Sequence, residues 1–133
     1  MVVDTDVFSF IFNRDSRAES YRRHVEGHIA SLSFQTVAEL LQGAYQRGWG
    51  EQRLGRLREE MRRYLVVPFD WEIVERFARL RAHRRSIGHE ITTADAWIAA
   101  TALWLECPVV THNIRDFSDI PDLHVITEAG ARI

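Results

Sequence analysis

Four acidic residues stand at positions where their carboxylates could meet around a metal ion: Asp4, Glu39, Asp95 and Asp116. Asp4 directly follows a short apolar run, and Asp116 lies in the loop after a later one. The other two fall in the first turn of an expected helix, among apolar neighbours. A carboxylate at an apolar position is costly unless something pairs with it. Such positions therefore call for an explanation.

A divalent cation would explain all four acids together. Converging carboxylates repel one another and raise one another's pKa. Hard Mg²⁺ or Mn²⁺ takes oxygen ligands and keeps water molecules that can reach a substrate phosphate. The residue types therefore favour metal-assisted chemistry on a phosphate ester.

Each acid also has a purely structural explanation. Thr36 and Thr92 each stand three residues before one of the acids, which is the spacing of a helix capping box. Asp4 could likewise cap a helix, and Asp116 could be an ordinary turn residue. Spacing alone leaves both explanations open.

The elements that must position these acids alternate along the chain. Short apolar runs predict strands over residues 2–3, 28–33, 64–67, 108–111 and 124–126. Helical periodicity lies between them, over residues 15–26, 36–46, 51–63, 70–85 and 92–106. This alternation predicts an α/β fold, with a central parallel five-stranded sheet flanked by helices. Ligands of such sheets bind beyond the carboxyl ends of the strands, where we expect all four acids.

Composition sets further bounds. The 133 residues, 46% hydrophobic and 27% charged, suit one soluble domain spanning residues 1–133. A net charge of −2 offers no overall basic excess, although all 17 basic residues are arginine. The single cysteine excludes an internal disulfide and favours a reducing cytoplasm. We expect no signal peptide and no membrane association, because the most apolar run is about half a membrane span.

Four segments resemble, in order and at matching intervals, the motifs of PIN domains, and most closely those of the single-domain VapC toxins. They are residues 2–7, 36–40, 91–102 and 110–117. The resemblance implies a PIN-like domain acting as a metal-dependent endoribonuclease, the toxin of a type II toxin–antitoxin system. It further implies an RNA substrate, a cognate VapB-like antitoxin, a homodimer, and contact with operator DNA only through the antitoxin.

The resemblance also implies roles for individual residues. Mg²⁺ or Mn²⁺ would bind at the four acids, and hydrolysis would leave a 5′-phosphate and a 3′-hydroxyl. Two further residues would give polar support near the metal: Thr111 and Asn113.

Several nearby residues have less definite roles. Asp6 departs from the usual pattern and could add a fifth carboxylate or, as we favour, cap the first helix. Arg115 is the best candidate for a contact with an RNA phosphate. Arg84 and Arg85 could make further contacts or belong to a solvated helix face. His112 could approach the substrate, although a metal-activated water needs no histidine base.

Two other functions fit parts of the pattern. A non-catalytic PIN scaffold would bind RNA or a partner protein without cutting it. A haloacid-dehalogenase-like phosphatase would use Asp4 as a nucleophile in an Asp-x-Asp motif. That family normally also needs a lysine, and the sequence contains none.

Overall fold

Five short parallel strands form one sheet in the computed structural model, which describes residues 1–130. The strand order is β3-β2-β1-β4-β5. The strands are β1 (Val2–Val3), β2 (Ser31–Ser33), β3 (Leu65–Val67), β4 (Val109–Val110) and β5 (Val125–Ile126). Val2 pairs with Ser31 on one side and with Val109 on the other. The predicted α/β fold with a parallel five-stranded sheet is confirmed. The last three residues of the predicted domain, 131–133, lie outside the described residues.

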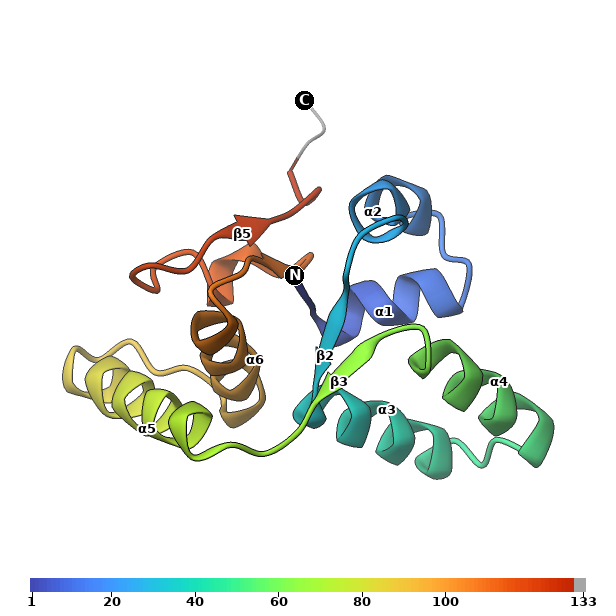
Figure 1. Cartoon of the computed structure of the whole chain (residues 1–133), viewed down its shortest axis with the longest axis horizontal. Coiled ribbons are helices and arrows are strands. Elements are labelled where there is room, and N and C mark those ends of the chain that lie inside the picture. Colours follow the sequence, from blue (N-terminus) through green and yellow to red (C-terminus); the bar gives the residue numbers. More distant parts are fainter. Residues whose placement is uncertain (131–133) are drawn as a thin grey trace.

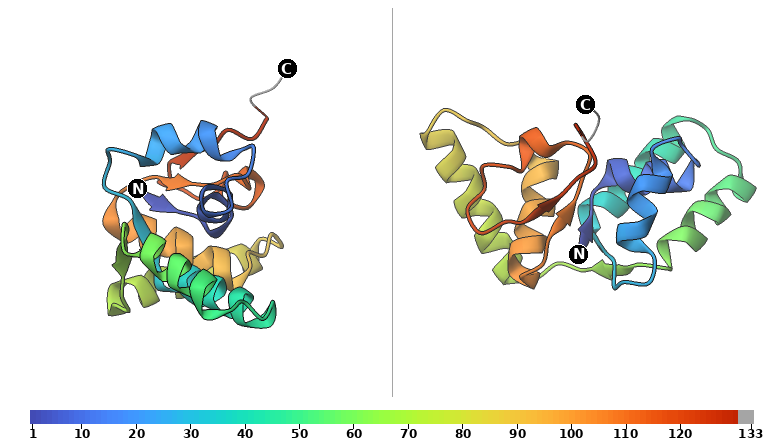
Figure 2. Two further views of the ribbon diagram at one scale, coloured as in Figure 1. Left: turned by 90° about the vertical axis from the view of Figure 1, so that its right-hand side faces the viewer. Right: turned by 90° about the horizontal axis from the view of Figure 1, so that it is seen from above.

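The helices pack on two sides of this sheet. Figure 1 shows α5 and α6 together on one side of the strands and α1 to α4 on the other, and the view from above in Figure 2 shows the same division. The helices are α1 (Thr5–Phe12), α2 (Ala18–Val25), α3 (Phe34–Gln46), α4 (Glu51–Met61), α5 (Trp71–Ser86) and α6 (Thr93–Leu105). Within residues 1–130, no helix combines the length and apolar character needed to cross a bilayer.

The central strand β1 divides the hydrophobic core. Successive side chains of a strand point to opposite faces of a sheet. Val3 accordingly packs with Phe8 and Leu57 on the side of α1 and α4, whereas Val2 packs with Ile98 and other residues on the side of α6. Both valines are fully buried. Since the sheet is covered on both faces, its open carboxyl edge is where side chains from several strands can meet.

Helix α6 lies against the middle of the sheet because much of its surface is small and apolar. Its buried residues include Ala96, Ile98, Ala99 and Ala102. The helix was predicted over residues 92–106 and is found within one residue of both ends. It brings Asp95, in its first turn, to the carboxyl edge of the sheet.

The main departure from the predicted elements is near the N-terminus. Helix was expected only from residue 15, but α1 already begins at Thr5, and α2 is shorter than predicted. The segment after Asp4 contains three phenylalanines, one valine and one isoleucine, which suit strands as well as helices. Arg14, with φ +54°, then turns the chain between the two helices.

Candidate active site

Asp4 ties the ends of two strands together. Its Oδ2 accepts a hydrogen bond from the Thr111 hydroxyl, which follows β4, at 2.6 Å. Its Oδ1 accepts from the backbone N–H of Thr5 at 2.8 Å, and Asp4 is the N-cap of α1. The side chain is buried. Burial, and then the negative charge of Asp6, raise the pKa of Asp4 to about 7.

Glu39 reaches the same region from α3. The Thr5 hydroxyl donates to Glu39 Oε1 at 3.1 Å and lies 3.0 Å from the hydroxyl of Thr36. The capping-box explanation for Glu39 is wrong, because α3 begins two residues before Thr36. Its cap is Ser33, whose side chain accepts from the N–H of Gln35. Glu39 therefore lies beyond the first turn, and capping does not explain its position.

Asp95 lies in the first turn of α6, three residues after the residue that caps this helix. Thr92 is the N-cap of α6, and its hydroxyl accepts from the backbone N–H of Asp95 at 3.2 Å, as a capping threonine should. Burial raises the pKa of the Asp95 side chain to about 6, helped by its hydrogen bond to Asp116 and by the charges of Asp116 and Glu39. The carboxylates of Asp95 and Asp116 are thus close neighbours.

Asp116 is positioned by the loop after β4. It ends a short 3₁₀ helix, η1 (Ile114–Asp116), and accepts a hydrogen bond from the Asn113 side-chain amide. The backbone N–H of Asn113 in turn donates to the Thr111 hydroxyl at 3.0 Å. A continuous chain of hydrogen bonds therefore runs from Asp4 through Thr111 and Asn113 to Asp116. Both residues expected to support the site lie within it.

Asp6 lies beside Asp4 and does not cap α1, contrary to the favoured expectation. The N-cap is Asp4. Asp6 Oδ1 accepts from the N–H of Val7 at 2.6 Å, and Oδ2 accepts from the N–H of His112 at 3.2 Å. Burial is the main cause that raises the pKa of Asp6. The position fits the alternative expectation, a fifth carboxylate at the rim.

The ring of His112 lies against α1 and α2. Its Nδ1 lies 2.6 Å from the hydroxyl of Tyr21, and its ring makes edge contacts with Tyr21 and Phe10. These contacts fit a structural role. Thr5 was not singled out from the sequence, although it adjoins Asp4 and its hydroxyl holds Glu39.

The arginines expected to contact RNA occupy different environments. Arg115 is exposed in η1, beside Asp116. Arg85 is exposed and has Glu90 as an ion-pair partner at 3.8 Å. Arg84 is only 3% exposed, and its Nε donates to the backbone carbonyl of His89 at 2.8 Å. That position does not fit a phosphate contact, because the guanidinium fixes the loop after α5.

The acids are suited to a divalent cation but are not arranged as a finished ligand set. Within residues 1–130, no three Asp, Glu, His or Cys side chains are arranged to hold one metal ion. The available donors are carboxylate oxygens, which Mg²⁺ and Mn²⁺ prefer. A bound cation would also offset the burial and the repulsion between carboxylates that together raise the pKa values of Asp4 and Asp95. The chemistry of the donors therefore fits such an ion.

Comparison with known proteins agrees with the geometry. The family model described as "PIN domain" matches residues 1–123. The protein "Ribonuclease VapC1" of Haemophilus influenzae (strain R2866) is 27% identical over 124 residues, covering 92% of each chain. The "Plasmid stability protein StbB" of Pseudomonas syringae pv. tomato is 31% identical, covering 88% of this chain and 90% of that protein.

A solved structure shares the whole fold. The structure of "VapBC-1 from nontypeable Haemophilus influenzae" superimposes with a TM-score of 0.83 at 25% identity, covering 95% of this chain and 96% of that one. The resemblance seen in the four sequence motifs is confirmed, and the haloacid-dehalogenase-like alternative gains no support. With a matching family model over nearly its whole length and a shared fold, the chain belongs to the PIN domain family.

Proposed function

We propose that the chain is a metal-dependent endoribonuclease and the toxin of a type II toxin–antitoxin system. The observation that carries this proposal is the convergence of four acids from distant parts of the chain on one edge of the sheet: Asp4, Glu39, Asp95 and Asp116. Similarity to a protein named Ribonuclease VapC1 supports the choice of RNA as substrate.

Three of the acids would hold Mg²⁺ or Mn²⁺ directly: Asp4, Asp95 and Asp116. A cation bound there would lower the pKa of a coordinated water and offset negative charge on the scissile phosphate. Glu39 would ligate through water or orient the attacking water. Thr111 and Asn113 would keep the carboxylates in place through the hydrogen bonds described above. Attack on phosphorus with departure of the 3′-oxygen, which takes up a proton, leaves a 5′-phosphate and a 3′-hydroxyl.

The test is cleavage of total bacterial RNA by the antitoxin-free protein with Mg²⁺ or Mn²⁺. We expect discrete fragments from the wild type, none in EDTA, and none from Asp95→Asn. The matched control is Asp122→Asn, the same change at an exposed residue outside the site. Circular dichroism of each variant checks the fold. A folded wild type that binds metal but cuts no RNA would refute the nuclease and favour the RNA- or partner-binding scaffold.

We also propose a VapB-like antitoxin as the protein partner, action in the cytoplasm, and operator DNA contact only through that antitoxin. The similar solved structure is that of VapBC-1, which supports an antitoxin partner. Coexpression followed by purification of the complex tests this proposal, with loss of ribonuclease activity on binding as the expected result.

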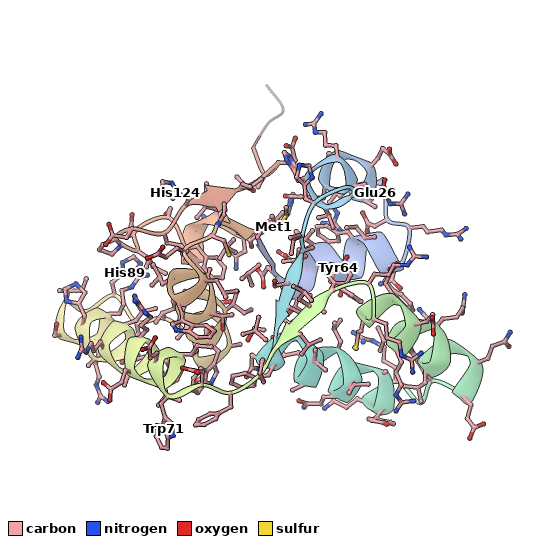
Figure 3. The ribbon with its side chains drawn as sticks, in the orientation of Figure 1. Met1, Glu26, Tyr64, Trp71, His89 and His124 are labelled. Atoms are coloured by element: carbon pink, nitrogen blue, oxygen red, sulfur yellow. The ribbon has the colours of Figure 1, made fainter. Side chains whose placement is uncertain are left out.

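A homodimer is the final part of the proposal. Apolar side chains are exposed around the open edge strand β3 and the start of α5: Leu65, Val66, Phe69 and Trp71. Trp71 is 73% exposed and projects away from the ribbon in Figure 3. Clustered exposed apolar side chains are typical of protein interfaces.

A further inference from the structure

A second group of arginines adjoins the acidic site, apart from those picked out by the sequence. A pocket of about 460 Å³ opens between α1, α3 and α4. Its lining joins Thr5 and Glu39, which belong to the site, to Arg47, Trp49 and Arg53. The pocket therefore places two cations next to the site where a phosphate would react.

Arg53 is held in position by an aromatic stack. Its guanidinium carbon lies 3.8 Å from the centroid of the Trp49 ring. The Trp49 ring in turn stacks with Phe12, at 5.8 Å between centroids and 22° between planes. Arg53 Nη2 also donates to the Asn13 side chain at 3.3 Å. Cation–π contacts of this kind fix the position of a charge without neutralising it.

The guanidinium of Arg47 occupies space left free by a glycine. A Cβ added at Gly43 would lie 2.8 Å from Arg47 Nη1. The guanidinium therefore lies against α3 at the pocket, in space that any larger residue at position 43 would take.

Neither arginine has an ion-pair partner in the part of the chain that the structure describes. By contrast, Arg17 pairs with Asp15, and Arg23 pairs with Glu128. Two neighbouring cations without an ion-pair partner, one of them held by an aromatic ring, form a site for an anion, and guanidinium groups bind phosphate oxygens in a two-pronged manner.

We propose that Arg47 and Arg53 bind backbone phosphates of the RNA strand on one side of the scissile bond. This inference rests on the proposed ribonuclease function and adds a substrate subsite to it. The need is electrostatic, since the chain carries a net charge of −2 and its acids repel RNA until a cation binds. The two arginines attract the RNA phosphates beside the acidic site. Their contacts also determine which phosphate of the RNA strand lies at that site.

The test measures RNA binding without requiring cleavage. A short fluorescein-labelled single-stranded RNA is titrated with full-length protein in EDTA, by fluorescence anisotropy, over a series of salt concentrations. Gel electrophoresis afterwards confirms that the RNA is intact. We expect Arg47→Gln and Arg53→Gln each to weaken binding about fivefold. Each should reduce the slope of log affinity against log salt by about 0.7, the value for one phosphate contact with a single strand.

Three further variants separate charge from structure. Arg56→Gln is the matched control, since Arg56 is exposed on the same helix α4 and lies outside the pocket; we expect no change. Arg53→Lys retains the charge and should keep most of the salt dependence. Gly43→Ala retains both charges but displaces Arg47 Nη1, and should weaken binding less than Arg47→Gln. Thermal unfolding of each variant confirms that the fold is intact.

The outcomes are distinct. Unchanged affinity and salt slope in the Arg47→Gln/Arg53→Gln double variant would overturn the subsite, as would a wild type that binds no RNA. If the double variant binds RNA as the wild type does but no longer binds the antitoxin, the RNA subsite is also overturned. The pocket then belongs to the contact with the protein partner. If the double variant loses RNA affinity while the wild type cuts no RNA with Mg²⁺, the subsite stands and the nuclease proposal fails.

Discussion

Asp4 receives hydrogen bonds from two different elements, and both counteract the effect of its burial. The Thr111 hydroxyl and the Thr5 N–H lower its pKa, but burial and the charge of Asp6 raise it further. The result is a pKa of about 7 against an ordinary value of 3.8. Without a metal, Asp4 therefore carries a proton at moderately acidic pH in the folded protein, whereas in the unfolded chain it is ionised.

This difference predicts how stability depends on pH. Between about pH 4 and 7 the folded state binds more protons than the unfolded state, so the free energy of unfolding falls as pH rises. Burial of Asp95, with its pKa of about 6, acts in the same direction. In EDTA, we expect the wild type to lose on the order of 2 kcal/mol relative to Asp4→Asn between pH 5 and pH 7.5. Urea denaturation at both pH values measures the difference.

Metal binding should reverse this trend. A cation binds the ionised carboxylates, so added Mg²⁺ or Mn²⁺ should stabilise the wild type more at pH 7.5 than at pH 5. The variant should gain little at either pH. The result that would contradict the assigned environment of Asp4 is measured in EDTA. It is a free energy of unfolding, relative to Asp4→Asn, that is the same or greater at pH 7.5 than at pH 5.

Residue types allowed most of the candidate site to be predicted. Asp4 and Asp116 follow strands and Asp95 begins a helix, so local sequence determines where each lies relative to the sheet. Thr111 and Asn113 followed from the family motif. Arg84 could not be placed in this way, because its burial depends on the loop after α5 folding back to offer the carbonyl of His89. Arg47 ends α3 eight residues after Glu39, at helical spacing on the same face, so the sequence carried a signal for it that was not used. Arg53 lies on α4, and no local pattern links it to Glu39.

Helix ends were predicted where their chemistry is local. The cap of α5 is Asp70, whose side chain accepts from the N–H of Glu72, and the helix was predicted from that residue. The start of α3 was missed by two residues because two possible caps, Ser33 and Thr36, lie close together. Helix α1 was missed because its residues suit strands equally well, and only packing of Val7 and Phe8 against the core decides between them.

The end of α6 leads to a prediction at this scale. Glu106 terminates the helix in the left-handed conformation, with φ 54° and ψ 46°, which favours glycine. Its side chain is exposed. Glu106→Gly should therefore increase the free energy of unfolding by about 1 kcal/mol. Chemical denaturation measures the gain. Glu106→Ala is the control and should give none, since alanine keeps the strain; an equal gain in both variants would locate the effect elsewhere.

At the scale of the whole molecule, the parallel sheet followed from the alternation of strands and helices, but its strand order did not. β1 lies in the centre because it pairs with both β2 and β4. These pairings join residues far apart in the sequence, so local patterns do not reveal them. The outer strand β3 pairs only with β2 in the described sheet, which leaves its other edge open beside Leu65 and Val66.

The proposed homodimer can be tested at this edge. We expect the wild type to have about twice the chain mass of 15.5 kDa by light scattering during size-exclusion chromatography. Phe69→Ser combined with Trp71→Ser should shift the protein toward the monomer, because both exposed side chains adjoin the open edge. Ile87→Ser is the control, as Ile87 is 57% exposed and lies at the opposite end of α5 from Trp71. A monomeric wild type would refute the homodimer.

The position of β1 has a consequence for how the protein is made. β1 leaves the ribosome before the other strands of this sheet, yet one of its neighbours, β4, is synthesised more than a hundred residues later. Domains fold largely as units, and distant pairings form late. Asp4 can meet Thr111 and Asp116 only after those residues have been synthesised. A chain that ends before them therefore lacks a complete acidic site. If the site cuts RNA, the cell that makes this protein is exposed to that activity only after the chain has been synthesised past Asp116.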